Sequence, residues 1–215
     1  MYKLVIFDLD GTLLNTIGDL AAAGNHTLEV MGFPQHPEES YRHFVGNGIP
    51  KLVARAVPPG TSEEDIQKVL NFYLSYYPEH CAEHTRFFLG VEETIRTLHE
   101  RGYLLAVLSN KTEATAKKII DRYFPDAPFR VVWGNNGVRP LKPATDAGYL
   151  LLSELGCGPE EVFYVGDGDT DMEFASRMGF FAAGATWGYR PAEVLKHCGA
   201  DALFSSMEEI LPYLP

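Results

Sequence analysis

The stretch LVIFDLDGTLLNT, residues Leu4–Thr16, decides the fold of this chain. Four apolar residues, Leu4–Phe7, run directly into Asp8, and a second acid, Asp10, follows after one more residue. A short run that is apolar on both faces is typical of a buried strand in a parallel sheet. Two carboxylates at the end of such a strand repel each other, so we expect a cation to balance their charge.

Further short apolar runs continue this pattern along the chain. They lie at Leu104–Leu108, Phe129–Trp133, Val162–Val165 and Phe180–Ala183, with a short last strand expected at Ala202–Phe204. Helical patterns separate them and stop at a glycine or before a proline: Val91–Glu100, Glu113–Tyr123 and Ala144–Leu155. Alternating strands and helices predict an α/β fold with a doubly wound parallel sheet.

The segment from Asn15 to about Arg86 breaks this alternation, because it shows no strand pattern. Its apolar residues repeat with helical spacing, first along one face at Ile17, Leu20, Ala21, Gly24, Leu28 and Met31. Further helical patterns cover Glu39–Phe44, Lys51–Ala56 and Glu63–Tyr76. We therefore predict an all-helical domain, residues 15–86, inserted into an α/β core domain made of residues 1–14 and 87–215.

Composition excludes several classes of function. The 215 residues are 46% apolar, which is enough for a packed core, and the formal net charge of −11 argues against a nucleic-acid or membrane-surface partner. No stretch approaches the ~20 apolar residues that cross a bilayer. The three cysteines, Cys81, Cys157 and Cys198, are an odd number without CxxC spacing, which suits a reducing cytoplasm better than a disulfide scaffold.

Polar side chains follow several of the predicted strands. Asp8 and Asp10 follow the first, Ser109-Asn110 the second and Asp167 the fourth, while Lys142 precedes the helix that leads to the fourth. The carboxyl ends of parallel strands meet at one edge of the sheet, where ligands bind. Several carboxylates beside one lysine require a divalent cation, and a set of oxygen ligands favours Mg²⁺.

These residues resemble the four motifs of the haloacid dehalogenase (HAD) superfamily of phosphohydrolases. DLDGT at residues 8–12 matches the first motif, Ser109 the second, Lys142 the third and GDGDTD at residues 166–171 the fourth. The resemblance implies a Rossmann-like core with a helical cap at the position of the inserted segment. The stretches DLAAAGNHTLEVMGFP and FVGNG are similar to the phosphoglycolate phosphatase branch.

The resemblance also implies a role for each matching residue. Asp8 would be the nucleophile that forms an aspartyl-phosphate, and Asp10 the general acid and base. Ser109 and the backbone N–H of Asn110 would bind phosphoryl oxygens. Lys142 would neutralise charge on Asp8 and on the phosphate, and together with Mg²⁺ would keep the pKa of Asp8 low.

A metal site is implied by the same motifs. Asp8, the backbone carbonyl of Asp10 and Asp167 would hold Mg²⁺, and Asp171 would orient Lys142 or a metal-bound water.

Substrate contacts are expected from the loop at GNG, residues 46–48, and we name Gly46, Asn47 and Lys51. A small acidic substrate needs a cation for its far end, and at least one of four flanking residues should face the core: Arg42, His43, Lys51 or Arg55.

The predicted function is Mg²⁺-dependent hydrolysis of a small phosphomonoester, with 2-phosphoglycolate as first candidate, by a cytoplasmic monomer or homodimer. A phosphosugar mutase or a pyrophosphatase of the same superfamily is the alternative, and a non-catalytic regulator that binds a phosphorylated ligand is the alternative from another class. Mutases that resemble the core carry a His where this chain has Leu20, and a Lys-Gly where it has Val45-Gly46. Both differences disfavour the mutase.

Overall fold

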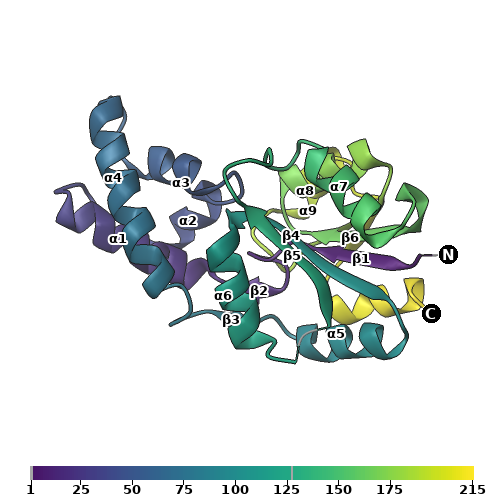
Figure 1. Cartoon of the computed structure of the whole chain (residues 1–215). Coiled ribbons are helices and arrows are strands. Elements are labelled where there is room, and N and C mark those ends of the chain that lie inside the picture. Colours follow the sequence, from purple (N-terminus) through teal and green to yellow (C-terminus); the bar gives the residue numbers. More distant parts are fainter. Residues whose placement is uncertain (1, 127) are drawn as a thin grey trace.

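The computed structural model describes residues 2–126 and 128–215. Its main part is built on a sheet of six parallel strands in the order β5-β4-β1-β6-β7-β8 (Figure 1). The strands are β1 (Leu4–Phe7), β4 (Leu104–Thr112), β5 (Phe129–Asn135), β6 (Val162–Gly166), β7 (Phe181–Ala185) and β8 (Ala202–Phe204). The chain runs outward from β1 through β4 to β5 and then returns to the other side of β1. This reversal confirms the predicted doubly wound sheet and creates a ligand-binding crevice at the carboxyl ends of the strands.

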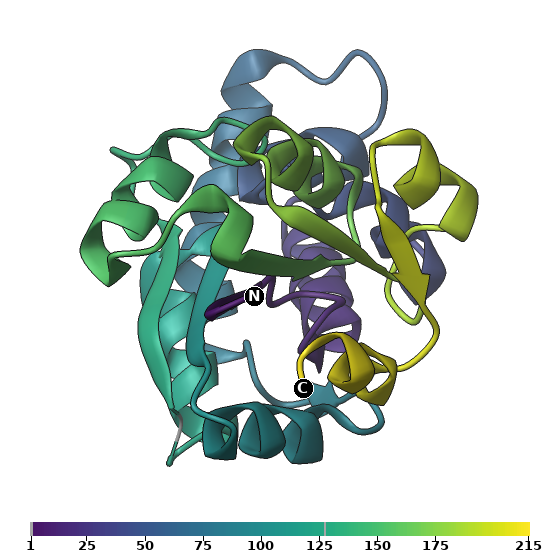
Figure 2. The same ribbon diagram turned by 90° about the vertical axis from the view of Figure 1, so that its right-hand side faces the viewer.

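Helices cover both faces of the sheet (Figure 2). Val5 and Phe7 pack in one apolar cluster with α5 (Val91–Glu100) and α6 (Glu113–Tyr123). Leu4 and Ile6 pack in a second cluster with α7 (Asp146–Leu155) and α8 (Asp169–Met178). Alternate residues of β1 thus pack against the helices on opposite faces of the sheet, because successive side chains of a strand point to opposite faces. The other helices of the core are η2 (Pro159–Glu161), α9 (Ala192–His197) and η3 (Met207–Tyr213).

Residues 15–86, called here the helical segment, form a separate group of helices at the left of Figure 1. They are α1 (Ile17–Val30), α2 (Glu38–Phe44), α3 (Ile49–Ala56), α4 (Glu63–Tyr76) and η1 (Tyr77–Glu79). A Cβ at Gly24 would overlap the ring of Tyr41, so the glycine lets this buried ring lie directly on α1. The helices form where the sequence indicates them, while the division into two domains stays a prediction.

Two short strands join the helical segment to the core, where the sequence analysis expected none. β2 (Leu14–Asn15) pairs antiparallel with β3 (Arg86–Phe87), and Leu14 lies opposite Phe87. The expectation was wrong here because strands of two residues are too short to show a period of two. The pairing places the two ends of the helical segment side by side.

Asp19 fixes the second of these connections. Its buried carboxylate accepts hydrogen bonds from the backbone N–H groups of Glu83, His84 and Thr85, and from the Thr85 hydroxyl at 2.6 Å. A carboxylate that accepts several backbone hydrogen bonds is well stabilised when buried. The segment before β3 is therefore held against the first turns of α1.

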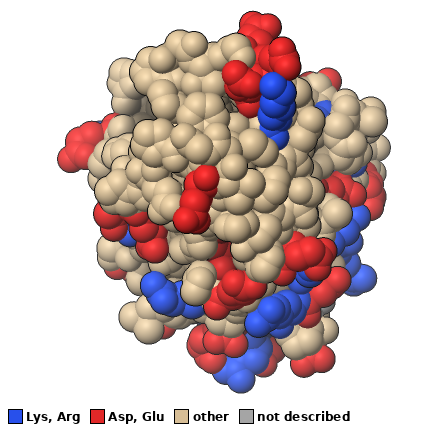
Figure 3. Space-filling model, turned by 90° about the vertical axis from the view of Figure 1, so that its left-hand side faces the viewer, with Lys and Arg blue, Asp and Glu red and all other residues tan. Residues whose placement is uncertain are grey.

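The surface of the helical segment carries mixed charge. Figure 3 views the left-hand side of Figure 1, where much of the surface is uncharged and the visible Lys and Arg side chains lie among Asp and Glu. In the part of the chain that the structure describes, no helix has the length and apolar character needed to span a bilayer.

Candidate active site

The turn after β1 places the first motif beside the fourth. Gly11 has a φ of +89°, which favours glycine, and a Cβ there would overlap the carboxylate of Asp167. The hydroxyl of Thr12 donates a hydrogen bond to Asp167 Oδ1 at 3.0 Å. The DGT sequence therefore allows the loop after β1 to approach the loop after β6 closely.

Three buried carboxylates meet around one lysine in this crevice. Oxygen atoms of Asp8, Asp167 and Asp171 all lie within 4.8 Å of one another. The Lys142 ammonium lies 2.9 Å from Asp8 Oδ1 and 2.7 Å from Asp171 Oδ1, and it also donates to the carbonyl of Leu108. When ionised, these carboxylates carry two more negative charges than the lysine balances.

Burial of this charge shifts the pKa values of the group. Burial raises the pKa of Asp8 to about 6, and Lys142 opposes this rise without cancelling it. Burial, together with Asp171 and Asp8, also raises the pKa of Asp167 well above its ordinary value. For Lys142, burial favours a lower pKa, but the carboxylates of Asp171 and Asp8 prevail and the pKa is raised. The low pKa expected for Asp8 therefore needs a second cation beside Lys142.

The donor atoms fit a divalent metal ion. They are all carboxylate oxygens, which Mg²⁺ prefers, and a charge of +2 would neutralise the cluster. Both oxygens of Asp171 already accept hydrogen bonds: Oδ1 from Lys142 and from Tyr164 at 2.8 Å, and Oδ2 from the backbone N–H of Gly168 at 3.0 Å. This arrangement suits the predicted role of Asp171 in orienting Lys142.

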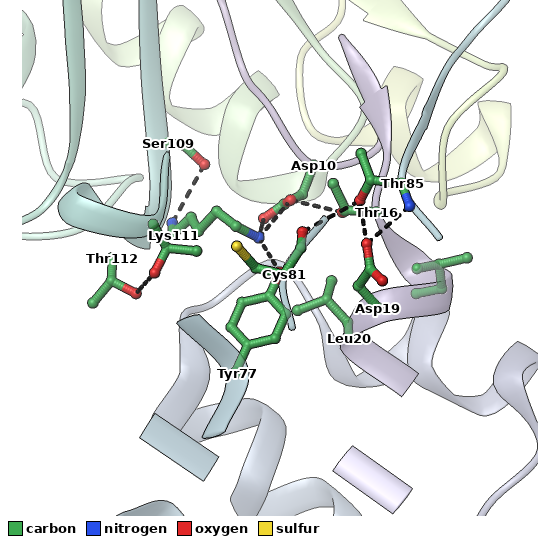
Figure 4. A network of polar contacts seen from close by, with 12 residues as sticks. Asp10, Thr16, Asp19, Leu20, Tyr77, Cys81, Thr85, Ser109, Lys111 and Thr112 are labelled. Carbon is green, nitrogen blue, oxygen red and sulfur yellow. Dashed lines mark hydrogen bonds and ion pairs between the residues drawn. The ribbon is translucent and has the colours of Figure 1, made fainter. Parts of the chain in front are cut away.

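Asp10 lies in a separate network that includes a lysine the sequence analysis did not identify (Figure 4). Its Oδ1 accepts hydrogen bonds from Lys111 Nζ at 2.8 Å and from Thr16 Oγ1 at 2.6 Å. Lys111 also donates to the Tyr77 hydroxyl at 2.6 Å, and its side chain is only 1% exposed. The sequence could have indicated this ion pair, because a lysine directly after Ser109-Asn110 in a buried strand needs a charged partner.

Asp8, Asp10, Lys142 and Asp167 line one cavity. Ser109 and Asn110, which follow Leu108 within β4, line it too. The Asn110 side-chain amide donates to the carbonyls of Gly46 and Lys142, both at 3.0 Å, and accepts from the Lys142 N–H at 2.8 Å. This amide thus fixes the backbone of Lys142 and of the GNG loop. The predicted contacts of Ser109 and Asn110 with phosphoryl oxygens stay predictions.

The helical segment closes one side of the cavity. Its contribution is mainly apolar: Leu20, Val45, Gly46, Gly48, Ile49 and Leu52. Of the predicted substrate contacts, Gly46 lies in this lining. Asn47 instead accepts a hydrogen bond from Arg55 at 2.6 Å on the exposed side, Lys51 is exposed, and neither lines the cavity.

The cation that lines this side of the cavity comes from the core, while the expected role of a cation from the helical segment stays a prediction. Within the described residues, none of Arg42, His43, Lys51 and Arg55 lines the cavity, although Arg42 lies over the ring of the core residue Tyr189. Arg190, in the loop after β7, does line it. Its guanidinium donates to the carbonyls of Arg42 and Val45, and its Nε lies 3.3 Å from Asp169 Oδ1.

The loop after β7 also supports the carboxylates. The backbone N–H of Tyr189 donates to Asp167 Oδ2 at 2.8 Å, and the Tyr189 hydroxyl accepts from the backbone N–H of Thr16 at 3.0 Å. A Cβ at Gly188 would overlap Asp167, so the glycine permits this approach. This loop was not predicted as part of the site, although β7 ends at the same edge of the sheet as β1, β4 and β6.

Known proteins match both this sequence and this fold. The haloacid dehalogenase-like hydrolase family matches residues 5–185. A phosphoglycolate phosphatase of Haemophilus influenzae is 32% identical over 99% of this chain and 98% of its own length, and one of Pseudomonas putida is 31% identical over 98% of this chain and 79% of its own. The crystal structure of a predicted phosphoglycolate phosphatase from Haemophilus somnus superposes with a TM-score of 0.93, at 29% identity, over 100% of this chain and 98% of that one.

The chain belongs to the haloacid dehalogenase-like hydrolase family, which confirms the resemblance inferred from its four motifs. Within this family it is a phosphatase, a phosphoric monoester hydrolase, as the sequence predicted. The mutase alternative is not favoured by these relatives.

Proposed function

We propose that this phosphatase is Mg²⁺-dependent and hydrolyses a small phosphomonoester, with 2-phosphoglycolate as the first candidate, through an aspartyl-phosphate on Asp8. The observation that carries this proposal is the separation of two carboxylates that are close in sequence. Asp8 joins Lys142 and the acidic cluster, whereas Asp10 joins Lys111 and Thr16. Different surroundings suit a nucleophile and an acid/base group, which need different protonation at the same pH.

In the first step, a carboxylate oxygen of Asp8 attacks phosphorus and the bond to the leaving oxygen breaks. Asp10 gives its proton to that oxygen, so an alcohol departs and Asp8 carries the phosphoryl group. Lys142 keeps a positive charge beside Asp8 during this transfer. Phosphoryl transfer requires mainly this kind of positioning and charge stabilisation.

In the second step, water attacks the phosphorus of the aspartyl-phosphate. Ionised Asp10 removes a proton from this water, the acyl-phosphate bond breaks, and Asp8 is restored as inorganic phosphate leaves. In the structure, Asp10 accepts hydrogen bonds from Lys111 and Thr16, as an ionised carboxylate does. This arrangement therefore supports the base form of Asp10.

Asp8, the carbonyl of Asp10 and Asp167 would hold Mg²⁺, which would neutralise charge on the transferring phosphoryl group. The helical segment would act as a cap that excludes water and contributes to specificity. We place the activity in the cytoplasm, where Cys81, Cys157 and Cys198 would stay free thiols as in this structure, in a monomer or homodimer.

The test is phosphate release from a panel of phosphorylated metabolites, ranked by kcat/KM with and without Mg²⁺. The panel includes 2-phosphoglycolate, pyrophosphate, nucleotides and sugar phosphates. We expect 2-phosphoglycolate to rank first and EDTA to abolish turnover. A different first substrate would replace the candidate, whereas phosphate release from none, not even from an aryl phosphate, would favour a non-catalytic regulator.

A further inference from the structure

Among the described residues, three cationic side chains line the cavity, and they differ in how far carboxylates balance their charge. Lys142 contacts the carboxylates of Asp8 and Asp171, and Lys111 contacts that of Asp10. The third cation, Arg190, contacts two neutral carbonyl groups and one partly exposed carboxylate, that of Asp169.

The partners of Arg190 are two backbone carbonyls and one partly exposed carboxylate, that of Asp169. Its Nη1 and Nη2 donate to the carbonyls of Arg42 and Val45, and the carboxylate of Asp169, which is 38% exposed, lies 3.3 Å from its Nε. These contacts account for three of the five N–H groups of a guanidinium. The carbonyl oxygens orient the group without cancelling its charge, and the partly exposed Asp169 contacts it only at Nε, so two N–H groups of Arg190 remain able to bind an anion.

The position of Arg190 suits the end of a substrate that is remote from phosphorus. It reaches from the core to the end of α2, and a Cβ at Gly46 would lie 3.1 Å from its Nη2. The neighbouring wall of the cavity is apolar, with Leu20, Ile49 and Leu52. A substrate bound to Asp8 through its phosphoryl group would meet this wall with its other end, and a guanidinium there favours a carboxylate.

We propose that Arg190 determines specificity by binding the anionic far end of the substrate, so that phosphomonoesters bearing a carboxylate are preferred over uncharged ones of the same size. This inference rests on the proposed function, because it places the transferring phosphoryl group at Asp8. It assigns the recognition of the acid to a core residue, whereas the sequence analysis expected one from the helical segment.

The test compares 2-phosphoglycolate with its amide, which has nearly the same shape and no charge at the far end. We expect the wild-type chain to prefer the acid in kcat/KM. Arg190→Gln should lose about 10- to 100-fold on the acid and less than about 3-fold on the amide, as loss of a charge-assisted hydrogen bond requires. Arg190→Lys keeps the positive charge but loses the planar array of N–H donors, so it should retain part of the preference for the acid over the amide.

Arg55→Gln is the matched control. Arg55 holds the same loop from its outer side, by hydrogen bonds to the carbonyl of Phe44 at 2.8 Å and to Asn47 Oδ1 at 2.6 Å, and it does not line the cavity. Its loss should change both substrates alike. If Arg55→Gln removed the preference as Arg190→Gln does, Arg190 would act only by holding the loop.

The remaining outcomes also decide the inference. Equal losses on both substrates in Arg190→Gln, or a preference that survives this substitution, would overturn it. If Arg190→Gln did not fold, Arg190→Lys and the wild-type preference would decide. Release of phosphate from acid and amide with equal kcat/KM by the wild-type chain would contradict only this inference, whereas release from neither would contradict the proposed function and this inference with it.

Discussion

The Nζ atom of Lys111 lies 2.8 Å from Oδ1 of Asp10 and 3.1 Å from Oδ2, so the side chain that follows Ser109-Asn110 is paired with the expected acid/base carboxylate. The Lys111 side chain is almost entirely buried, and its ammonium also lies 4.8 Å from the centre of the Tyr77 ring. Tyr77 belongs to η1 of the helical segment. Lys111 therefore links the position of Asp10 to that segment.

Replacement of Lys111 should impair turnover. Within the described residues, Lys111→Met leaves the partly buried Asp10 carboxylate with only Thr16 as a side-chain donor, and breaking an ion pair whose lysine is buried is destabilising. We expect kcat to fall by about 10-fold or more, as for a partial loss of general-base catalysis, and the melting temperature to fall too. Lys117→Met, which breaks an exposed pair with Glu113, is the control and should retain both values. A wild-type kcat in Lys111→Met would show that Asp10 works without this lysine.

Loss of the Asp10 carboxylate should trap the covalent intermediate. With an aryl phosphate whose leaving group needs no proton, Asp10→Asn retains the attack by Asp8, but hydrolysis of the aspartyl-phosphate should slow by about 10²–10⁴-fold. Borohydride reduction after rapid denaturation would convert the labelled residue 8 to homoserine, which peptide mass detects. Asp8→Asn should show neither label nor turnover. Label that forms without Asp8, or a wild-type steady-state rate in Asp10→Asn, would contradict the assigned roles.

Asp167 should be required for the metal ion. Its carboxylate lies in the buried cluster with Asp8 and Asp171 and is held by Thr12 and by the Tyr189 N–H. Asp167→Ala should weaken Mg²⁺ binding strongly in calorimetry and nearly abolish turnover. Asp169→Ala, which removes a neighbouring but partly exposed acid, should leave Mg²⁺ affinity close to that of the wild type. Unchanged affinity in Asp167→Ala would exclude Asp167 from the metal site.

Stability without Mg²⁺ should depend on pH with a sign set by Asp8. Its pKa of about 6 in the folded chain exceeds the value of ~3.9 expected when unfolded, so between these values the folded state binds more protons. The free energy of unfolding then falls as pH rises through this window. The raised pKa of Asp167 acts in the same direction.

Saturating Mg²⁺ should therefore raise the melting temperature more at pH 8 than at pH 5, because protons compete with the metal for these carboxylates. Differential scanning fluorimetry at both pH values measures this. An equal rise at both would show that the cluster does not control metal binding.

The sequence predicted those parts of the fold that long patterns encode. β1, α4, α5 and α6 have the expected bounds, because apolar runs and helical periods of sufficient length define them. The strand β4 extends to Thr112, beyond the predicted end at Leu108, because its last residues are polar. The two-residue strands β2 and β3 depend on pairing between distant segments, which no local pattern reveals.

The candidate site was predictable where a motif or a strand end identifies it. Asp8, Ser109, Lys142 and Asp167 do meet in one cavity. Tyr189 and Arg190 were missed because their importance arises from contacts with Asp167 and with α2, which only the folded chain brings near. Asn47 and Lys51 illustrate the reverse: they lie close to the cavity in sequence, but Lys51 is exposed on α3 and Asn47 bonds Arg55 on the outer side of the loop.

The hydrogen bond from Arg190 to the carbonyl of Val45 joins residues 145 positions apart in the chain. A chimera that receives the helical segment of a relative would keep the native loop after β7. The donated loop would then have to offer its carbonyls to this arginine at the native spacing. Recombination between relatives should therefore yield active hybrids mainly when residues 186–190 come from the same parent as the helical segment. To exchange substrate preference, this short core loop should be exchanged together with that segment.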